Sequence, residues 1–283
     1  MKENNFVISA YGVRVPRITY GTAWKKDRTA ALVEQAVTLG FCGIDTACQP
    51  KHYDEPGVGA GLARCLGAGL TRADIYLQSK FTPAMGQDPQ RMPYDPKASP
   101  AEQVAQSFET SLNNLRTNYL DCLVLHSPLG SAGATMEVWQ AMEAIFDAGG
   151  AKQLGISNCY ELAQLAHLYR SAVVKPAVVQ NRFYADTGYD REIRTFCRQH
   201  RILYQSFWTL TANPQVLAHG TIKALASKYR RTPAQVFFRY LTQIDIIPLT
   251  GTTSEAHMRE DLAIFDFELT KNECEAVSAL LSA

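Results

Sequence analysis

Residues 41–45 read FCGID, a short apolar run that ends at an acidic side chain, and the same arrangement recurs along the chain. Residues 75–80 (IYLQSK) and 122–126 (CLVLH) end in the same way at a lysine and a histidine. Further apolar runs with polar ends lie at 18–22, 154–158, 177–181, 202–206 and 244–250. An amphipathic helical pattern separates most neighbouring runs, and strands that alternate with helices favour a parallel sheet.

Eight such units in a chain of 283 residues predict a closed (β/α)₈ TIM barrel. We expect a single domain, residues 1–283, because no linker or low-complexity tract interrupts the rhythm. Segments 6–8 and 13–15 flank a glycine and predict a β-hairpin that plugs the bottom of the barrel. Extra helices are predicted after the seventh strand, over 215–229, and at the C-terminus from Thr270.

The composition argues against nucleic acid and membrane partners. The formal net charge is +1, from 28 basic and 27 acidic residues, and the doublet Lys25-Lys26 is interpreted as a solvated loop end. No stretch approaches the roughly 18 apolar residues of a membrane span. The seven cysteines are scattered without a CxxC pair, which indicates buried thiols in a reducing compartment and no metal site. The first residues contain no apolar leader, so we expect a cytoplasmic protein.

Polar residues at consecutive strand ends point to a functional rim. Asp45, Lys80 and His126 follow the second, third and fourth predicted strands. Taken singly, an acidic residue after a strand is often a helix cap, a lysine a solvated loop residue, and a histidine a hydrogen-bonded core residue. Together they lie at the C-terminal ends of barrel strands, where barrel active sites are built. That coincidence favours a catalytic role.

Several sequence blocks resemble those of the aldo-keto reductase superfamily. They are GIDTA at 43–47, HYDEPGVGAGL at 52–62, LQSK at 77–80, LVLHSP at 123–128, GISN at 155–158, VVQNRFY at 178–184 and FDFELTKNE at 265–273. The resemblance runs from Gly21-Thr22 to about Glu273 with the blocks in the family's order. It implies an oxidoreductase that transfers hydride between NADP(H) and the carbonyl or alcohol group of small aldehydes or ketones.

The resemblance also implies a catalytic tetrad in which Asp45, Lys80 and His126 are joined by a tyrosine. The family places this tyrosine five residues after the aspartate, where this chain has Pro50. Residues 48–53 look like a small insertion, and Tyr53 precedes an acidic turn as the family's tyrosine does. We therefore expect Tyr53 in this role, with His52 as the adjacent competitor.

These residue types suit carbonyl reduction. Hydride transfer leaves an alkoxide, and a phenol with a pKa near 10 is a poor proton donor unless a nearby ammonium lowers that pKa. We expect Lys80 to lower the pKa of Tyr53, Asp45 to keep Lys80 charged, and His126 to hydrogen-bond the substrate oxygen.

At the cofactor site that the resemblance implies, this chain differs from the family's pattern at some positions. Ser157, Asn158 and Gln180 would hold the nicotinamide carboxamide, and Gly21, Thr22 and Ser206 would border the cofactor. The family stacks a tyrosine on the nicotinamide where this chain has Gln205, so Trp208 or Phe207 is the candidate substitute. Residues 57–61 (GVGAG) superficially resemble a phosphate loop, but they follow no strand and predict tight helix packing instead.

A second departure concerns the 2′-phosphate. NADP-specific members carry a lysine directly after the proline of strand eight, and this chain has Leu249 there. Thr250, Thr252, Thr253, the N-terminus of the following helix and Arg259 are the remaining candidates for binding that phosphate. The sequence therefore predicts NADP(H), with NAD(H) as an open alternative.

The substrate side is predicted less specifically. Segment 82–98 holds four prolines and forms either a wall of the substrate pocket or a tolerated surface insertion. Trp24, Met85 and Tyr94 are the candidate pocket residues, together with Tyr53 and Trp208. The expected partner is a small carbonyl compound; no protein partner is predicted.

Two other functions remain open at this stage. One is a regulatory or redox-sensing role on the same fold with little turnover, as in potassium-channel β subunits. The other is a barrel isomerase or lyase in which Lys80 forms a Schiff base.

Overall fold

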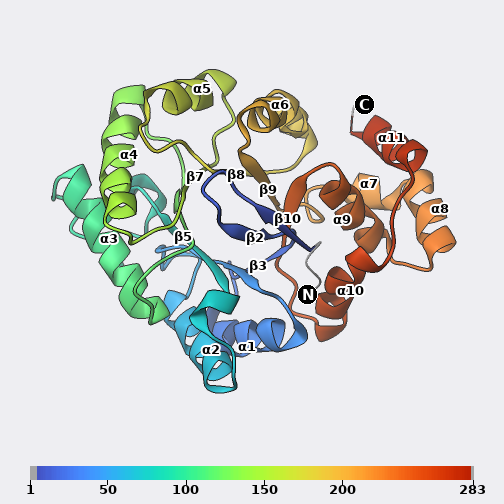
Figure 1. Cartoon of the computed structure of the whole chain (residues 1–283), viewed down its shortest axis with the longest axis horizontal. Coiled ribbons are helices and arrows are strands. Elements are labelled where there is room, and N and C mark those ends of the chain that lie inside the picture. Colours follow the sequence, from blue (N-terminus) through green and yellow to red (C-terminus); the bar gives the residue numbers. More distant parts are fainter. Residues whose placement is uncertain (1–4, 282–283) are drawn as a thin grey trace.

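The computed structural model describes residues 5–281, which form a closed barrel of parallel strands surrounded by helices (Figure 1). The strands follow one another in sequence order, and β10 closes the barrel against β3. They are β3 (Thr19–Gly21), β4 (Gly43–Asp45), β5 (Tyr76–Phe81), β6 (Cys122–Leu125), β7 (Leu154–Ser157), β8 (Val178–Arg182), β9 (Leu203–Phe207) and β10 (Ile246–Thr250). The predicted (β/α)₈ barrel is confirmed. Residues 1–4 and 282–283, which the predictions of a single domain and of no leader include, lie outside the described residues.

The helices cover the outside of the barrel (Figure 1). They are α1 (Thr29–Leu39), α2 (Glu55–Gly67), α3 (Pro100–Leu115), α4 (Ala132–Asp147), α5 (Leu162–Ser171), α6 (Arg191–His200), α7 (Pro214–Ala218), α8 (Gly220–Tyr229), α9 (Pro233–Gln243), α10 (Glu255–Leu262) and α11 (Lys271–Leu280). The extra helices after the seventh barrel strand and at the C-terminus are confirmed. The segment predicted as one helix is divided at His219, whose extended backbone ends α7 and caps α8. Among the described residues, no helix is long and apolar enough to cross a membrane.

An N-terminal hairpin closes the bottom of the barrel. Strands β1 (Phe6–Ile8) and β2 (Arg14–Pro16) pair antiparallel, and they lie across the centre of the barrel (Figure 1). Val13 and Val15 are buried against apolar side chains from the barrel interior, Tyr76 and Val178 among them. The hairpin therefore acts as the predicted plug, since it shields the interior that the open barrel end would expose to water.

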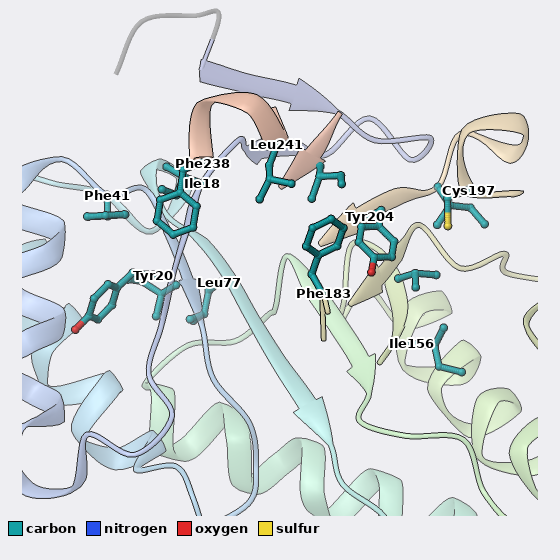
Figure 2. Packing of buried hydrophobic residues seen from close by; sticks show 14 of the residues in the cluster. Ile18, Tyr20, Phe41, Leu77, Ile156, Phe183, Cys197, Tyr204, Phe238 and Leu241 are labelled. Atoms are coloured by element: carbon teal, nitrogen blue, oxygen red, sulfur yellow. The ribbon is translucent and has the colours of Figure 1, made fainter. Parts of the chain in front are cut away.

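Alternate strand residues divide between the barrel interior and the helical layer. On β5, Tyr76 packs with the interior cluster, whereas Leu77 belongs to the cluster between strands and helices. Figure 2 shows that second cluster, with Leu77, Phe41 and Ile156 among its members. The strands extend further than the apolar runs suggested, so Asp45 and Lys80 are the last or near-last residues of strands rather than loop residues. Hydrogen bonds to polar side chains in the barrel interior explain why such residues are tolerated there.

The glycines at 57–61 serve helix packing, as the sequence predicts. A Cβ added at Gly59 would lie 2.0 Å from the main-chain oxygen of Asn114, so α2 can approach the end of α3 only without a side chain there. A Cβ at Gly61 would lie 2.5 Å from the main-chain oxygen of Ala30 on α1. Both contacts are with backbone, which cannot move aside like a flexible side chain.

Replacement of Gly59 therefore tests this packing, with Gly67 at the exposed end of the same helix as the matched control. Gly59→Ala should lower the free energy of unfolding by about 1–3 kcal/mol, the usual cost of overpacking. Gly67→Ala meets no atom within 4 Å and should be neutral or stabilising by up to about 1 kcal/mol, because alanine favours helix. Urea denaturation curves measure both values. Equal effects of the two substitutions would contradict the packing role of Gly59.

Candidate active site

A buried ion pair lies at the C-terminal end of the barrel. The Lys80 ammonium nitrogen is 2.7 Å from the Asp45 carboxylate, and both side chains are almost fully buried. Lys80 also donates to the main-chain oxygen of Thr46 at 2.8 Å. Burial lowers the pKa of Lys80, but Asp45 and Tyr53 outweigh this and hold that pKa above its ordinary value. Lys80 is therefore a charged ammonium at neutral pH.

Three glutamine amides form a polar layer beneath this pair. Gln78 and Gln180 donate to the second carboxylate oxygen of Asp45 at 2.7 and 2.9 Å. The same two amides donate to the Gln205 oxygen at 2.8 and 2.9 Å, and Gln205 returns a bond to Gln78 at 3.2 Å. The Asp45 carboxylate thus accepts from two amides and one ammonium, so its charge is fully solvated by protein groups. We call Gln78, Gln180 and Gln205 the amide layer.

Tyr53 reaches this site from the loop between β4 and α2. Its backbone N–H donates to the Gln49 oxygen at 3.0 Å, and the next residue, Asp54, caps α2 by accepting from Gly57. The Lys80 nitrogen lies 5.1 Å from the Tyr53 ring centre, and the His126 ring stands edge-on to it at 6.0 Å. Spacing alone could not choose between Tyr53 and His52; the structure brings Tyr53 to the ion pair.

The competitor, His52, points elsewhere. Its imidazole packs against the Trp24 indole with ring centres 4.0 Å apart, and its Nδ1 lies 3.0 Å from the Gln49 side-chain oxygen. The Trp24 backbone N–H donates to the His52 oxygen at 2.7 Å. His52 therefore ties the loop after β4 to the loop after β3.

The ionisation of Tyr53 differs from the expectation. Burial raises its pKa, and the opposing effect of Lys80 is smaller, so the pKa of Tyr53 lies above 10.0 rather than below it. The prediction of a lowered pKa considered the ammonium and left out the desolvation of the phenolate. At neutral pH the phenol carries its proton, which suits a group that donates a proton.

His126 is held as a neutral imidazole. Burial, with the charge of Lys80 and the nearby His52, lowers the pKa of His126 well below 6.5. Its Nδ1 lies 2.6 Å from the Thr82 hydroxyl oxygen, and its main-chain oxygen accepts from the Asn158 side chain at 2.8 Å. The Thr82 contact was missed by sequence reasoning, because it joins residues that follow different strands.

The three residues of the predicted carboxamide clamp differ in exposure. Gln180 is 2% exposed, and its amide nitrogen is committed to the amide layer. Ser157 is also buried and donates to the Gln180 main-chain oxygen at 2.7 Å. Asn158 is half-buried and has a left-handed backbone with φ of 53°. Of the three, Asn158 is the residue whose side chain reaches the rim.

The strand that carries Gln205 turns outward at Trp208. Gln205 and Ser206 are fully buried, and Ser206 accepts from the Thr209 hydroxyl at 2.9 Å. Trp208 is 49% exposed and has a φ of 55°. The Arg182 guanidinium lies 4.2 Å from the Trp208 ring centre. Non-glycine residues with positive φ are uncommon and cluster at functional sites, and Trp24, Asn158 and Trp208 all have this backbone at the same rim.

The loop between β10 and α10 contains the remaining cofactor candidates. The Thr250 hydroxyl donates to buried Asp261 at 2.6 Å, and the Thr252 hydroxyl lies 3.4 Å from His257 Nδ1. Arg259 is bound by Glu255 at 2.7 and 3.2 Å on the exposed face of α10.

Loops on the two sides of this region meet at Lys25. Lys25 is half-buried, and its ammonium donates to the Gly251 main-chain oxygen. Burial and the charge of Arg28 lower the pKa of Lys25. Thr22 is buried next to Gly21, and its hydroxyl donates to the Asp45 main-chain oxygen at 2.9 Å.

The candidate pocket residues are dispersed. Met85 is 99% exposed, whereas Tyr94 is buried, with its hydroxyl on the Thr82 main-chain oxygen at 2.8 Å. A cavity of about 520 Å³ borders the Tyr53 loop, and its lining includes Trp24 and, from segment 82–98, Arg91 and Pro93. The segment contains one 3₁₀ turn at Ala84–Gly86, and Gln87 and Tyr94 anchor it to the barrel.

One buried carboxyl was also missed from the sequence. Glu55, at the start of α2, accepts from Ser79 at 2.5 Å, Ser111 at 3.0 Å and Asn114 at 3.4 Å. Burial raises the pKa of Glu55, which the hydrogen bonds oppose. Ser79 points out of the barrel beside inward-pointing Lys80, so Glu55 fixes the strand that carries the lysine. The alternation of inward and outward residues on β5 is the signal that would have indicated this contact.

Residues 17–282 match the model of the Aldo/keto reductase family. The chain belongs to this family. It is 30% identical to an uncharacterised oxidoreductase, YtbE, of Bacillus subtilis (strain 168), over 88% of this chain and 82% of that protein. It is 27% identical to an NADPH-dependent alpha-keto amide reductase of Saccharomyces cerevisiae, over 95% of this chain and 88% of that protein. The structure resembles an aldo/keto reductase from Brucella melitensis, with a TM-score of 0.83, 28% identity and coverage of 97% and 98% of the two chains.

This membership places the chain among the carbonyl oxidoreductases. A regulatory protein with little turnover, the alternative that the sequence left open, is not favoured by these relatives. The buried Lys80 also argues against a Schiff-base lyase, because a lysine that attacks a carbonyl must be neutral, and Asp45 keeps this one charged.

Asp261 beneath Thr250 gives a test of the rim's electrostatics. Burial raises its pKa from 3.8 to about 7, so between these values the unfolded chain ionises and the folded chain does not. The contribution of Asp261 to the free energy of unfolding should therefore be largest below pH 4. It should fall as the pH rises toward 7, by up to about 4 kcal/mol.

Asp261→Asn should remove this dependence, because asparagine stays neutral and still accepts the Thr250 bond. The variant should match the wild type in urea denaturation near pH 4 and exceed it near pH 8. An equal difference between the two proteins at both pH values would contradict the assignment.

Proposed function

We propose that the chain is an NADP(H)-dependent reductase of small aldehydes or ketones in which Tyr53, Lys80, Asp45 and His126 carry the proton chemistry. The observation that supports it most strongly is the position of Tyr53. Its ring lies between the buried Lys80–Asp45 pair and His126, although an insertion separates it from the spacing expected for the family.

The roles of the four residues follow from their ionisation. A bound nicotinamide supplies the hydride, which protein side chains cannot do. Protonated Tyr53 donates its hydroxyl proton to the oxygen that was the substrate carbonyl. The Lys80 ammonium then stabilises the phenolate, and Asp45 holds that ammonium in place. Neutral His126 donates a ring N–H to the same substrate oxygen and orients it.

Some side chains and backbone groups at the C-terminal ends of the barrel strands have the chemistry to contact a dinucleotide. Asn158, which donates to the His126 main-chain oxygen, and the exposed Trp208 would offer an amide and an aromatic face to a nicotinamide. At the other end, Lys25, Thr252 and the N-terminus of α10 offer an ammonium, a hydroxyl and backbone N–H groups to phosphate, and the Thr252 hydroxyl oxygen already accepts from the Ser254 N–H at 3.1 Å. Half-buried Gly21 and the buried residues Thr22, Ser157, Gln180, Ser206 and Thr250 would shape this surface from below. Arg259 would have to exchange Glu255 for a 2′-phosphate.

Cofactor preference is open to direct measurement. Titration of the protein with NADPH or NADH, followed by quenching of intrinsic fluorescence, should give a smaller dissociation constant for NADPH. The expected ratio is about 10-fold or more, corresponding to about 1.4 kcal/mol from contacts to the 2′-phosphate. Tighter binding of NADH would overturn the assignment of NADP(H).

The proton donor is tested by a pair of adjacent substitutions. Tyr53→Phe removes the hydroxyl and keeps the ring, so it should lower carbonyl reduction by about 10²–10⁴-fold, the usual contribution of a general acid. His52→Phe keeps an aromatic ring against Trp24 and should retain most activity. A panel of aldehydes and ketones followed by NADPH absorbance measures the rates, and fluorescence titration checks that both variants bind NADPH. Activity retained by the Tyr53 variant and lost by the His52 variant would reverse the assignment.

We further propose a single domain and a cytoplasmic location. Elements from β1 to α11 belong to the barrel or pack on it, which supports one folding unit. The seven cysteines are free in the structure, which supports a reducing compartment. Small carbonyl compounds remain the proposed substrates.

A further inference from the structure

The imidazole of His126 is held at one ring nitrogen by a hydroxyl from the neighbouring strand. Thr82 follows β5 directly, and its Oγ1 lies 2.6 Å from His126 Nδ1. The main chain of His126 is fixed separately, because its N–H donates to the Phe81 oxygen at 2.9 Å and its oxygen accepts from Asn158 at 2.8 Å. The hydroxyl contact therefore concerns the ring and not the position of the backbone.

Counting protons decides the direction of this hydrogen bond. A neutral imidazole has one N–H, at either Nδ1 or Nε2, and a threonine hydroxyl has one proton to donate. Thr82 is 3% exposed, and among the described residues His126 Nδ1 is the polar partner of its hydroxyl. If Nδ1 carried the imidazole proton, the buried hydroxyl proton would have no acceptor, and a buried donor without a partner is strongly disfavoured.

We propose that Thr82 is a positioning residue that fixes His126 in the tautomer with its proton on Nε2. The hydroxyl donates to Nδ1, and the remaining N–H is then available to a substrate carbonyl oxygen. In the other tautomer Nε2 would present a lone pair to that oxygen and could not bind it. This inference rests on the proposed role of His126 in carbonyl reduction.

Side chains of segment 82–98, which follows β5, hold Thr82 in position. The main-chain oxygen of Thr82 accepts from the Tyr94 hydroxyl at 2.8 Å and from the Gln87 amide at 3.2 Å. Gln87 also donates to the Cys48 oxygen at 2.8 Å, in the loop that carries Tyr53. Two buried side chains of segment 82–98 thus hold Thr82 in place, and one of them joins it to the Tyr53 loop.

The test uses Thr82→Val, which replaces the hydroxyl with a methyl of similar size, and Thr82→Ser, which restores a hydroxyl. Thr82→Val should lower kcat for carbonyl reduction by about 10–100-fold, the range for groups that orient a functional imidazole. The dissociation constant for NADPH should change less than about twofold, because Thr82 is proposed to act on the ring alone. Thr82→Ser should recover most of kcat.

Thr19→Val is the matched control for loss of a buried threonine hydroxyl. Thr19 lies at the start of β3, at the other end of the barrel, and its hydroxyl has no hydrogen-bond partner among the described residues. This variant should keep the wild-type kcat. A loss in the Thr19 variant as large as that in Thr82→Val would attribute the effect to packing and overturn the proposal.

Nitrogen-15 NMR of the histidine rings reads the tautomer without catalysis. The protein has six histidines, and the His126 signals are those lost in His126→Gln. The wild type and Thr82→Ser should show a protonated Nε2 and an unprotonated Nδ1, whereas Thr82→Val should show a mixture or the reverse. A wild-type ring protonated at Nδ1, or an unchanged tautomer in Thr82→Val, would overturn the proposal. A wild type that reduces no carbonyl compound would instead refute the proposed function, and the ring signals would still report the effect of Thr82.

Discussion

The buried Lys80–Asp45 ion pair is the constraint on which the interior of the barrel depends. Two charges withdrawn from water are tolerated only when protein groups replace the lost hydration. Here the Thr46 main-chain oxygen accepts a hydrogen bond from Lys80, and the amides of Gln78 on β5 and Gln180 on β8 donate to Asp45. The same two amides also donate to the Gln205 side-chain oxygen on β9. A barrel interior that is apolar at the bottom, around Val15, is therefore polar at its other end, around Asp45 and Lys80.

Burial at this end of the barrel shifts the pKa values of acidic and basic groups in opposite directions. It raises the pKa of Tyr53 and lowers the pKa of His126, so both side chains are neutral near pH 7 and both can hold a proton to donate. Lys80 is the exception, because Asp45 compensates for its desolvation. The site thus combines one fixed positive charge with two neutral donors, an arrangement suited to the appearance of negative charge on a substrate oxygen.

The sequence predicted the barrel because its signals are local. Each strand is an apolar run, each helix has its own periodicity, and Asp45, Lys80 and His126 stand at successive strand ends. Contacts between distant residues are harder to foresee: Thr82 meets His126 only after β5 and β6 are side by side, and the contact of Glu55 with Ser79 is indicated only by the alternation of inward and outward residues on β5. The hydrogen bond from Gln180 to Asp45 was not foreseen for a related reason, because it depends on strands running further than their apolar residues. An insertion made the loop spacing ambiguous, and only three-dimensional proximity separates Tyr53 from His52.

The departures from the family pattern gather on one side of the site. Gln205 stands where the resemblance led us to expect an aromatic ring against the nicotinamide, and its amide is committed to Gln78 and Gln180. An amide cannot provide an aromatic face; of the two candidate substitutes, Trp208 is 49% exposed with a positive φ, and Phe207 is half-buried at the end of β9. The strands β4 to β6, by contrast, carry Asp45, Lys80 and His126 in the family's pattern. Under the proposed function, the changes along β9 and β10 therefore bear on the binding of the dinucleotide, whereas the side chains proposed for proton transfer lie on β4 to β6 and in the loop after β4.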